Sequence, residues 1–159
     1  MQRAGQTIGL VVILAICFGA AALGSSATAS HLDDWYAALA KPSWTPPAWV
    51  FGPMWTVLYV CMAVAAWLVW RQRGIVDARV PLALFLVQLA FNAVWSWLFF
   101  GLHNAGLAFV DIVLLLAAIV VTMVAFWRRS VLAASLLVPY LAWVAFAGVL
   151  NFAIWRMNL

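Results

Sequence analysis

The sequence predicts an all-α membrane protein, a bundle of five transmembrane helices. Of its 159 residues, 69% are hydrophobic and 8% are charged, and the mean hydropathy is +1.12. A soluble domain normally carries about 25% charged residues, so this chain has too little polar surface to be one. Five apolar stretches are long enough to cross roughly 30 Å of hydrocarbon at about 1.5 Å per residue. They lack the alternation of barrel strands, which favours helices.

The five predicted helices form a single domain over residues 1–159. The first helix covers about 8–29, and Arg3, the apolar run and Ala27-Thr28-Ala29 would also fit a cleaved signal peptide, which stays an alternative for this segment. Residues 30–46 form the long loop after it. The other predicted helices span about 47–70, 80–101, 105–126 and 131–155.

Prolines mark the second and fifth helices. Thr45-Pro46-Pro47 predicts that the second helix begins at Pro47, with Thr45 as a candidate cap. Pro53 and Pro139 fall inside predicted helices, where each removes a backbone hydrogen bond and tends to bend the axis. Membrane helices also tolerate proline without such a role, so both interpretations remain open.

Positive charge is divided unequally between the two sides of the bundle. One side carries Arg3, Arg71, Arg73, Arg79, Arg128 and Arg129, and the other carries Lys41 and Arg156. In a bacterial plasma membrane, the positive-inside rule predicts a cytoplasmic N-terminus, with the loop at 30–46 and the C-terminus outside. Because the basic residues form no stripe, we expect no binding of nucleic acid.

The segment 35–59 is rich in aromatic residues and proline. It contains Trp35, Tyr36, Trp44, Trp49, Trp55 and Tyr59 together with four prolines. Prolines reduce the conformational entropy that a loop loses when it becomes ordered. We therefore expect an ordered lid made of the first four aromatic residues, with Trp55 and Tyr59 in the pocket wall below it.

Aromatic and polar side chains also share helical faces. Spacings of three, four and seven residues align Trp55 with Tyr59, Gln88 with Asn92, Trp95 and Ser96, and Tyr140 with Trp143, Ala147 and Asn151. Polar groups are costly against lipid, so these faces should point into the bundle. They suit a pocket for a flat, largely apolar ligand. Core packing or helix contact is the alternative role for the tryptophans.

Other reactive residues indicate no catalytic or metal chemistry. His31 and His103 have no second ligand at a useful spacing, so we expect no metal site. Asp111 lies near the start of the fourth helix, where a structural role near the interface is favoured over a proton relay. The chain contains no catalytic serine, histidine and acid set and no phosphate-binding loop.

Several motifs, in order along the chain, resemble the TspO/MBR family of tryptophan-rich sensory proteins, translocator proteins and peripheral benzodiazepine receptors. They are Trp35-Tyr36, Lys41-Pro42-Ser43-Trp44, Pro46-Pro47, Trp49-Val50, Trp55-Thr56 with Leu58-Tyr59, Gln88-Leu89-Ala90 with Asn92, Trp95, Phe99-Phe100-Gly101, Pro139-Tyr140-Leu141-Ala142-Trp143 and Leu150-Asn151. The match runs from the first helix to the C-terminus.

This resemblance implies a homodimeric membrane protein that binds a porphyrin, protoporphyrin IX or haem, with no required cofactor and a sensory role in porphyrin or stress handling. The implied ligand residues are Tyr36, Trp55, Asn92, Trp95, Trp143 and Ala147, and the helical spacing adds Tyr59. Transport of hydrophobic ligands and light-dependent porphyrin degradation through Trp55 and Trp143 are the alternatives. A sterol role is not expected, because Phe152 replaces the tyrosine of the family's sterol pattern.

Overall fold

The protein is a bundle of membrane-spanning helices. The computed structural model describes residues 3–159, without the side chains of residues 3 and 73–75. Its elements are α1 (Arg3–Ala29), η1 (Leu32–Tyr36), α2 (Ala48–Ser96), η2 (Trp97–Gly101), α3 (Ala105–Trp127), α4 (Val131–Leu136) and α5 (Val138–Met157). Five segments are long and apolar enough to cross a membrane: Ala4–Ala29, Ala48–Gln72, Val76–Gly101, Ala105–Trp127 and Val131–Met157. The predicted five-helix bundle is confirmed.

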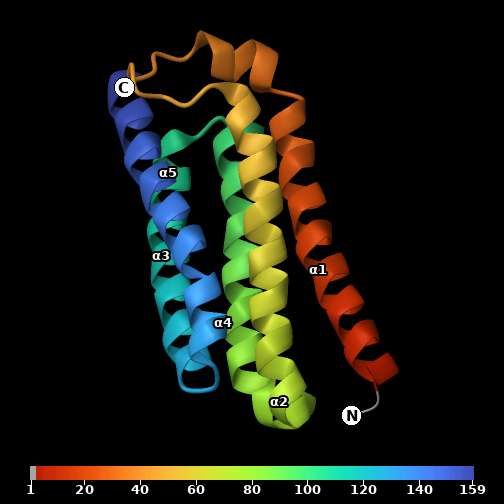
Figure 1. Cartoon of the computed structure of the whole chain (residues 1–159). Helices are drawn as coiled ribbons and strands as arrows, with labels where there is room; N and C mark the ends of the chain where they lie inside the picture. Colours follow the sequence, from red (N-terminus) through yellow and green to blue (C-terminus); the bar gives the residue numbers. More distant parts are fainter. Residues whose placement is uncertain (1–2) are drawn as a thin grey trace.

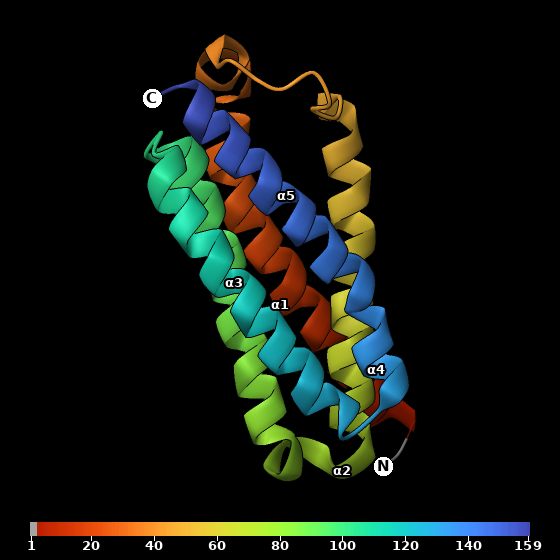
Figure 2. The ribbon, with the colours of Figure 1, turned by 90° about the vertical axis from the view of Figure 1, so that its left-hand side faces the viewer.

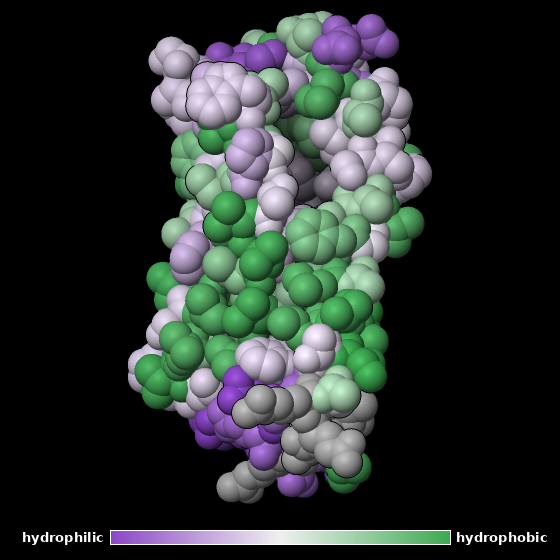
Figure 3. Space-filling model, turned by 45° about the vertical axis from the view of Figure 1, so that its right-hand side comes forward, coloured by the Kyte–Doolittle hydropathy of each residue, from purple (hydrophilic) through white to green (hydrophobic). Residues whose placement is uncertain are grey.

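The long helix α2 folds back on itself and supplies two of the five spans. Its first arm covers Ala48–Gln72, and its second arm, which continues into η2, covers Val76–Gly101. Figures 1 and 2 show the lid (residues 30–46) and the C-terminus at one end of the bundle, and the N-terminus with the α2 reversal at the other. An apolar band separates the two polar ends on the face shown in Figure 3. The chain is therefore a multi-pass membrane protein, and its orientation remains a prediction.

The chain departs from straight α-helices at three places, where one helical segment passes into the next or ends. The reversal of α2 is itself helical, where the sequence suggested a loop. The third span ends in the π-helical turn η2, closed by a 2.8 Å bond from the Leu102 N–H to the Trp97 carbonyl. The fifth span breaks at Leu137 between α4 and α5. Because Pro139 has no N–H, the bend expected inside this helix is a break just before it.

The start of α2 also departs from the predicted cap. The helix begins at Ala48, and Pro47 occupies the capping position without a side-chain hydrogen bond. Thr45 does not cap it: its hydroxyl donates to the Pro42 carbonyl at 2.7 Å, and its N–H donates to the same oxygen at 3.0 Å. The threonine therefore closes a turn in the lid and fixes the path of the chain into α2.

Helix α1 is fastened to both arms of α2 by tryptophans. Trp67 Nε1 donates to the Gln6 carbonyl at 3.0 Å near one end, and Trp97 Nε1 donates to the Leu23 carbonyl at 2.9 Å near the other. The Trp67 indole thus joins α1 to the first arm of α2. Helix α1 therefore leans across the bundle, against the first arm near the N-terminus and the second arm near the lid.

Close packing near the lid requires a small residue in α1. A Cβ atom added at Gly24 would lie 3.1 Å from Ser96 Oγ, whereas one added at Gly5 would meet nothing within 4 Å. We predict that Gly24→Leu lowers the stability of the detergent-solubilised protein by about 1–3 kcal/mol, because overpacking forces the helices apart. Thermal unfolding should show a lower Tm for Gly24→Leu and an unchanged one for Gly5→Leu. Equal Tm values for both variants would contradict this close contact.

Candidate functional site

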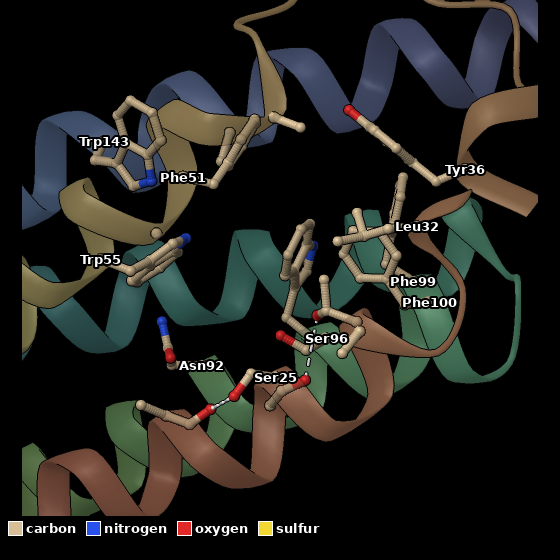
Figure 4. A pocket seen from close by; sticks show the side chains of 18 of the residues that line it. Ser25, Leu32, Tyr36, Phe51, Trp55, Asn92, Ser96, Phe99, Phe100 and Trp143 are labelled. Carbon is tan, nitrogen blue, oxygen red and sulfur yellow. Dashed lines mark hydrogen bonds between the residues drawn. The ribbon is translucent and has the colours of Figure 1, made fainter. Parts of the chain in front are cut away.

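A cavity of about 570 Å³ lies beneath the lid. Its walls come from α1, the lid, both arms of α2, η2 and α5, so segments far apart in the sequence meet around one space (Figure 4). The structure brings all seven sequence-predicted site residues to this cavity: Tyr36, Trp55, Tyr59, Asn92, Trp95, Trp143 and Ala147. Their role in binding a ligand remains a prediction.

Ten of the 25 residues that line the cavity are aromatic. Trp55 packs against Tyr59 with ring centroids 5.6 Å apart, and Phe51 meets the Trp143 ring edge-to-face at 5.8 Å. Among the lining residues there is no Lys, Arg, His, Asp or Glu. Such a surface favours the ring system of a flat ligand over a charged group.

A chain of hydrogen bonds forms the floor of the cavity. The Tyr59 hydroxyl donates to Asn92 Oδ1, and Asn92 Nδ2 donates to the Tyr140 hydroxyl at 3.2 Å. The Tyr140 hydroxyl in turn donates to Gln88 Oε1 at 2.8 Å. All four side chains are buried, and the chain joins both arms of α2 to α5. It holds Asn92 in one orientation at the edge of the cavity.

A second tie fixes Trp95. Its Nε1 donates to Asn151 Oδ1 at 2.9 Å, and Asn151 Nδ2 donates to the Ala105 carbonyl at 2.8 Å. The Trp95 ring also stacks on Phe99 at 5.3 Å. The indole of Trp95 therefore presents its ring to the cavity while its nitrogen is engaged elsewhere.

Trp143 differs from Trp95, because its nitrogen has no partner. Trp143 Nε1 is buried and makes no hydrogen bond within the described part of the chain. Figure 4 shows Trp143, Trp55 and Asn92 directed into the same space from α5 and the two arms of α2. A buried unpaired N–H costs free energy, typically about 1–3 kcal/mol, which a ligand acceptor would recover. Trp143 is therefore a candidate donor to a ligand.

The lid contributes Tyr36 to the cavity. Burial raises the pKa of the Tyr36 phenol above its usual value, so its hydroxyl stays protonated at neutral pH. Lys41 lies 4.8 Å from the Tyr36 ring centroid and donates to the carbonyls of Tyr36, Ala37 and Leu39. Trp35 and Trp44, predicted parts of the same cover, do not line the cavity: Trp35 stacks on His103 and Trp44 meets Phe146.

Two buried polar groups lie outside the cavity lining. Asp111 is 6% exposed and its Oδ2 has no hydrogen-bond partner among the described residues, as is true of Gln88 Nε2. The described residues hold no group of three or more metal-binding side chains. His31 and His103 contact each other at 4.8 Å between ring centroids and form part of the support beneath Trp35.

The fold and the cavity together define a multi-pass membrane protein with five spans and an aromatic chamber under an ordered lid. The profile of the TspO/MBR family matches residues 11–156. The chain therefore belongs to the TspO/MBR family, as the sequence motifs indicated.

Named relatives support this membership. The translocator protein of Homo sapiens is 49% identical over 126 residues, which cover 78% of this chain and 75% of the human one. The tryptophan-rich protein TspO of Archaeoglobus fulgidus is 43% identical over 149 residues, 94% of each chain. The tryptophan-rich sensory protein of Cereibacter sphaeroides is 40% identical over 141 residues, 87% of each chain.

Sequence reasoning missed part of the lining. Helix α1 contributes residues that were not predicted, among them Phe18, Ser25 and Thr28, and η2 contributes Phe99 and Phe100. The motif Phe99-Phe100-Gly101 was present in the sequence, but its helical phase changes in the π turn. In α1, the three-residue spacing of Ser25 and Thr28 was a weak signal of an inward face.

The hydrogen-bonded floor gives a stability prediction. Tyr140→Phe leaves Gln88 Oε1 and Asn92 Nδ2 without their partner, and should lower stability by about 1–2 kcal/mol. Tyr36→Phe is the matched control, because among the described residues the contacts of Tyr36 with Lys41 are made by its carbonyl and its ring, not by its hydroxyl. Thermal unfolding in detergent measures this loss of stability. A Tyr140→Phe variant as stable as wild type would show that these hydrogen bonds do not stabilise the fold.

Proposed function

We propose that this protein binds a tetrapyrrole in the cavity and serves a sensory or regulatory role in porphyrin handling. The observation that carries the proposal is an aromatic chamber of about 570 Å³ with a buried, unpaired donor at Trp143 Nε1. This volume lies within the usual range of about 300–1,000 Å³ for ligand sites. The aromatic walls suit a flat conjugated ring, and Trp143 supplies a fixed polar contact.

The distribution of charge suggests how a porphyrin would lie. Charged side chains are absent from the lining, so the macrocycle belongs inside and the propionates belong at the opening, where water or lipid headgroups meet them. Within the chamber, the ring of Trp55 lies against one face of the ligand, and Trp143 meets the other face edge-on. In that orientation the Trp143 N–H donates to an imine nitrogen of free-base protoporphyrin IX, and Asn92 is oriented toward the same region by Tyr59 and Tyr140.

Light-dependent degradation of the bound porphyrin is a second candidate, favoured by one observation. Trp55 and Trp143 both line the cavity, and indoles are readily oxidised. Illumination of the aerobic protein with protoporphyrin IX should then remove the Soret band faster than in detergent alone. Equal rates of loss with and without the protein would overturn this candidate.

The homodimer also stays a proposal. A shallow apolar groove on α1 and the second arm of α2 includes Ile16, Gly19 and Ala90. The small residue Gly24 on α1 packs against Ser96 inside the bundle and so is not available to a second copy. Cross-linking in native membranes that yields only monomer would overturn the dimer. No sterol site is proposed: Phe152 packs against Phe109 on the outside of the bundle.

Titration of protoporphyrin IX into detergent-solubilised protein tests the principal proposal. Trp143→Phe keeps the aromatic ring but removes the donor, and should weaken binding about five- to ten-fold, as expected for one hydrogen bond of roughly 1–1.5 kcal/mol. Tryptophan quenching and the Soret shift measure the affinity. Trp55→Ala with Trp143→Ala should abolish saturable binding, whereas Trp127→Phe, at the far end of α3, should bind like wild type. Equal binding by the double variant and wild type would place the porphyrin elsewhere.

A further inference from the structure

The cavity has three boundaries through which a ligand could pass: the lid, the side between the first arm of α2 and α5, and the side between the first arm and α1. They differ in the hydrogen bonds and ring contacts that hold each of them closed. We propose that ligands reach the cavity sideways from the bilayer, through a portal between α1 and the first arm of α2, while the lid stays closed.

The lid is fastened at several points. Asn158 binds the backbone of Ala40 twice, accepting from its N–H at 3.0 Å and donating to its carbonyl at 2.9 Å. Trp35 packs edge-to-face on Phe99 at 5.4 Å and stacks on His103 at 4.5 Å. These contacts attach the lid to η2, to His103 beyond it and to the end of α5. Opening the lid would break all of them together.

The side between the first arm of α2 and α5 is filled by rings. Trp44 meets Phe146 at 5.8 Å, Phe146 meets Trp143 at 5.6 Å, and Trp143 meets Phe51 at 5.8 Å. This continuous row of four aromatic side chains runs from the lid down to the cavity wall. A planar ligand could pass here only by displacing several packed rings.

The side between α1 and the first arm of α2 is open by comparison. Ser25 on α1 and Gly52 and Thr56 on α2 line the cavity and are exposed. Trp49 and Phe18, also in the lining, are 75% and 39% exposed. Figure 3 shows a hollow near the lid end of the face that includes α1. The cavity therefore meets the membrane between these two helices.

The polar groups at this opening do not close it. The Ser25 hydroxyl donates to the Ala21 carbonyl at 2.6 Å within α1 (Figure 4). The Thr56 hydroxyl donates to the Gly52 carbonyl at 2.9 Å within α2. A Cβ atom at Gly52 would meet nothing within 4 Å, so space is free beside it. The hydroxyls therefore need no partner across the gap, and the two helices can separate there without losing a hydrogen bond.

The portal selects ligands by how readily they partition from water into the bilayer. A planar, mainly apolar molecule that dissolves in the bilayer, with any charged groups at the headgroup level, arrives at the depth of the opening beside Trp49. A strongly hydrophilic molecule would have to pass the lid. Membrane-dissolved amphiphiles with flat ring systems are thus the ligand class that this route admits.

Rates of binding in phosphatidylcholine nanodiscs test the portal with protoporphyrin IX as the probe, which rests on the proposed function. Gly52→Phe places a ring in the opening and should slow association and dissociation together by about ten-fold. Asn158→Ala loosens the lid and should change neither rate beyond about two-fold. Gly5→Phe, on open surface elsewhere in α1, is the matched control. Unchanged rates in Gly52→Phe, or faster rates in Asn158→Ala, would overturn the portal.

A second measurement needs no porphyrin, so the two proposals can fail separately. In a Cys17→Ala, Cys61→Ala background, Ala147→Cys places a thiol in the cavity wall. A lipid-soluble phenylmaleimide should label this thiol in nanodiscs about ten-fold more slowly when Gly52→Phe is added, and equally fast when Asn158→Ala is added. A labelling rate that changes in Asn158→Ala but not in Gly52→Phe would overturn the portal, even if the protein binds porphyrin. Portal-dependent labelling without porphyrin binding would overturn only the proposed ligand.

Discussion

The hydrogen-bonded chain from Tyr59 through Asn92 and Tyr140 to Gln88 is the interaction on which the rest of the structure depends. Polar groups inside a bilayer have no water to bond, so they must satisfy one another, and in doing so they fix which helix faces meet. Here they join the two arms of α2 to α5 at the level of the cavity floor. The space above this floor is left to aromatic side chains, and Trp143 Nε1 is the donor that the network leaves unused.

The lid is held to the bundle by more contacts than the side wall between α1 and the first arm of α2, and this difference bears on where a ligand would enter. The lid is attached through bonds from the Asn158 side chain to the Ala40 backbone and through stacked rings, as between Trp35 and His103. Helix α1 is held by an indole near each end, whereas at the opening the Ser25 hydroxyl bonds within α1 and, among the described residues, to no neighbouring helix. A closed lid over a loosely closed side wall suits a protein whose ligand is already dissolved in the membrane.

Much of this arrangement could be predicted from the sequence, because hydropathy and helical spacing report on local geometry. The five spans were predicted, and residues on separate helices, such as Trp55, Asn92 and Trp143, do face one cavity. The π turn at η2 could not be predicted, since it depends on tertiary packing, whereas Pro139 did predict a bend close to the break at Leu137. Spacing also gives the face of a helix but not its tilt, so the contribution of α1 to the cavity was missed.

A ligand bound in this cavity as proposed takes the free donor of Trp143. Two-dimensional ¹H–¹⁵N spectra that resolve the indole N–H signals test this binding mode, with protoporphyrin IX added to the protein in nanodiscs. The Trp143 signal should show a saturable shift as the hydrogen bond forms, the Trp55 signal should show a ring-current shift, and the Trp127 signal should not change. Shifts confined to Trp127 and other outward indoles, with Trp143 unmoved, would contradict this binding mode.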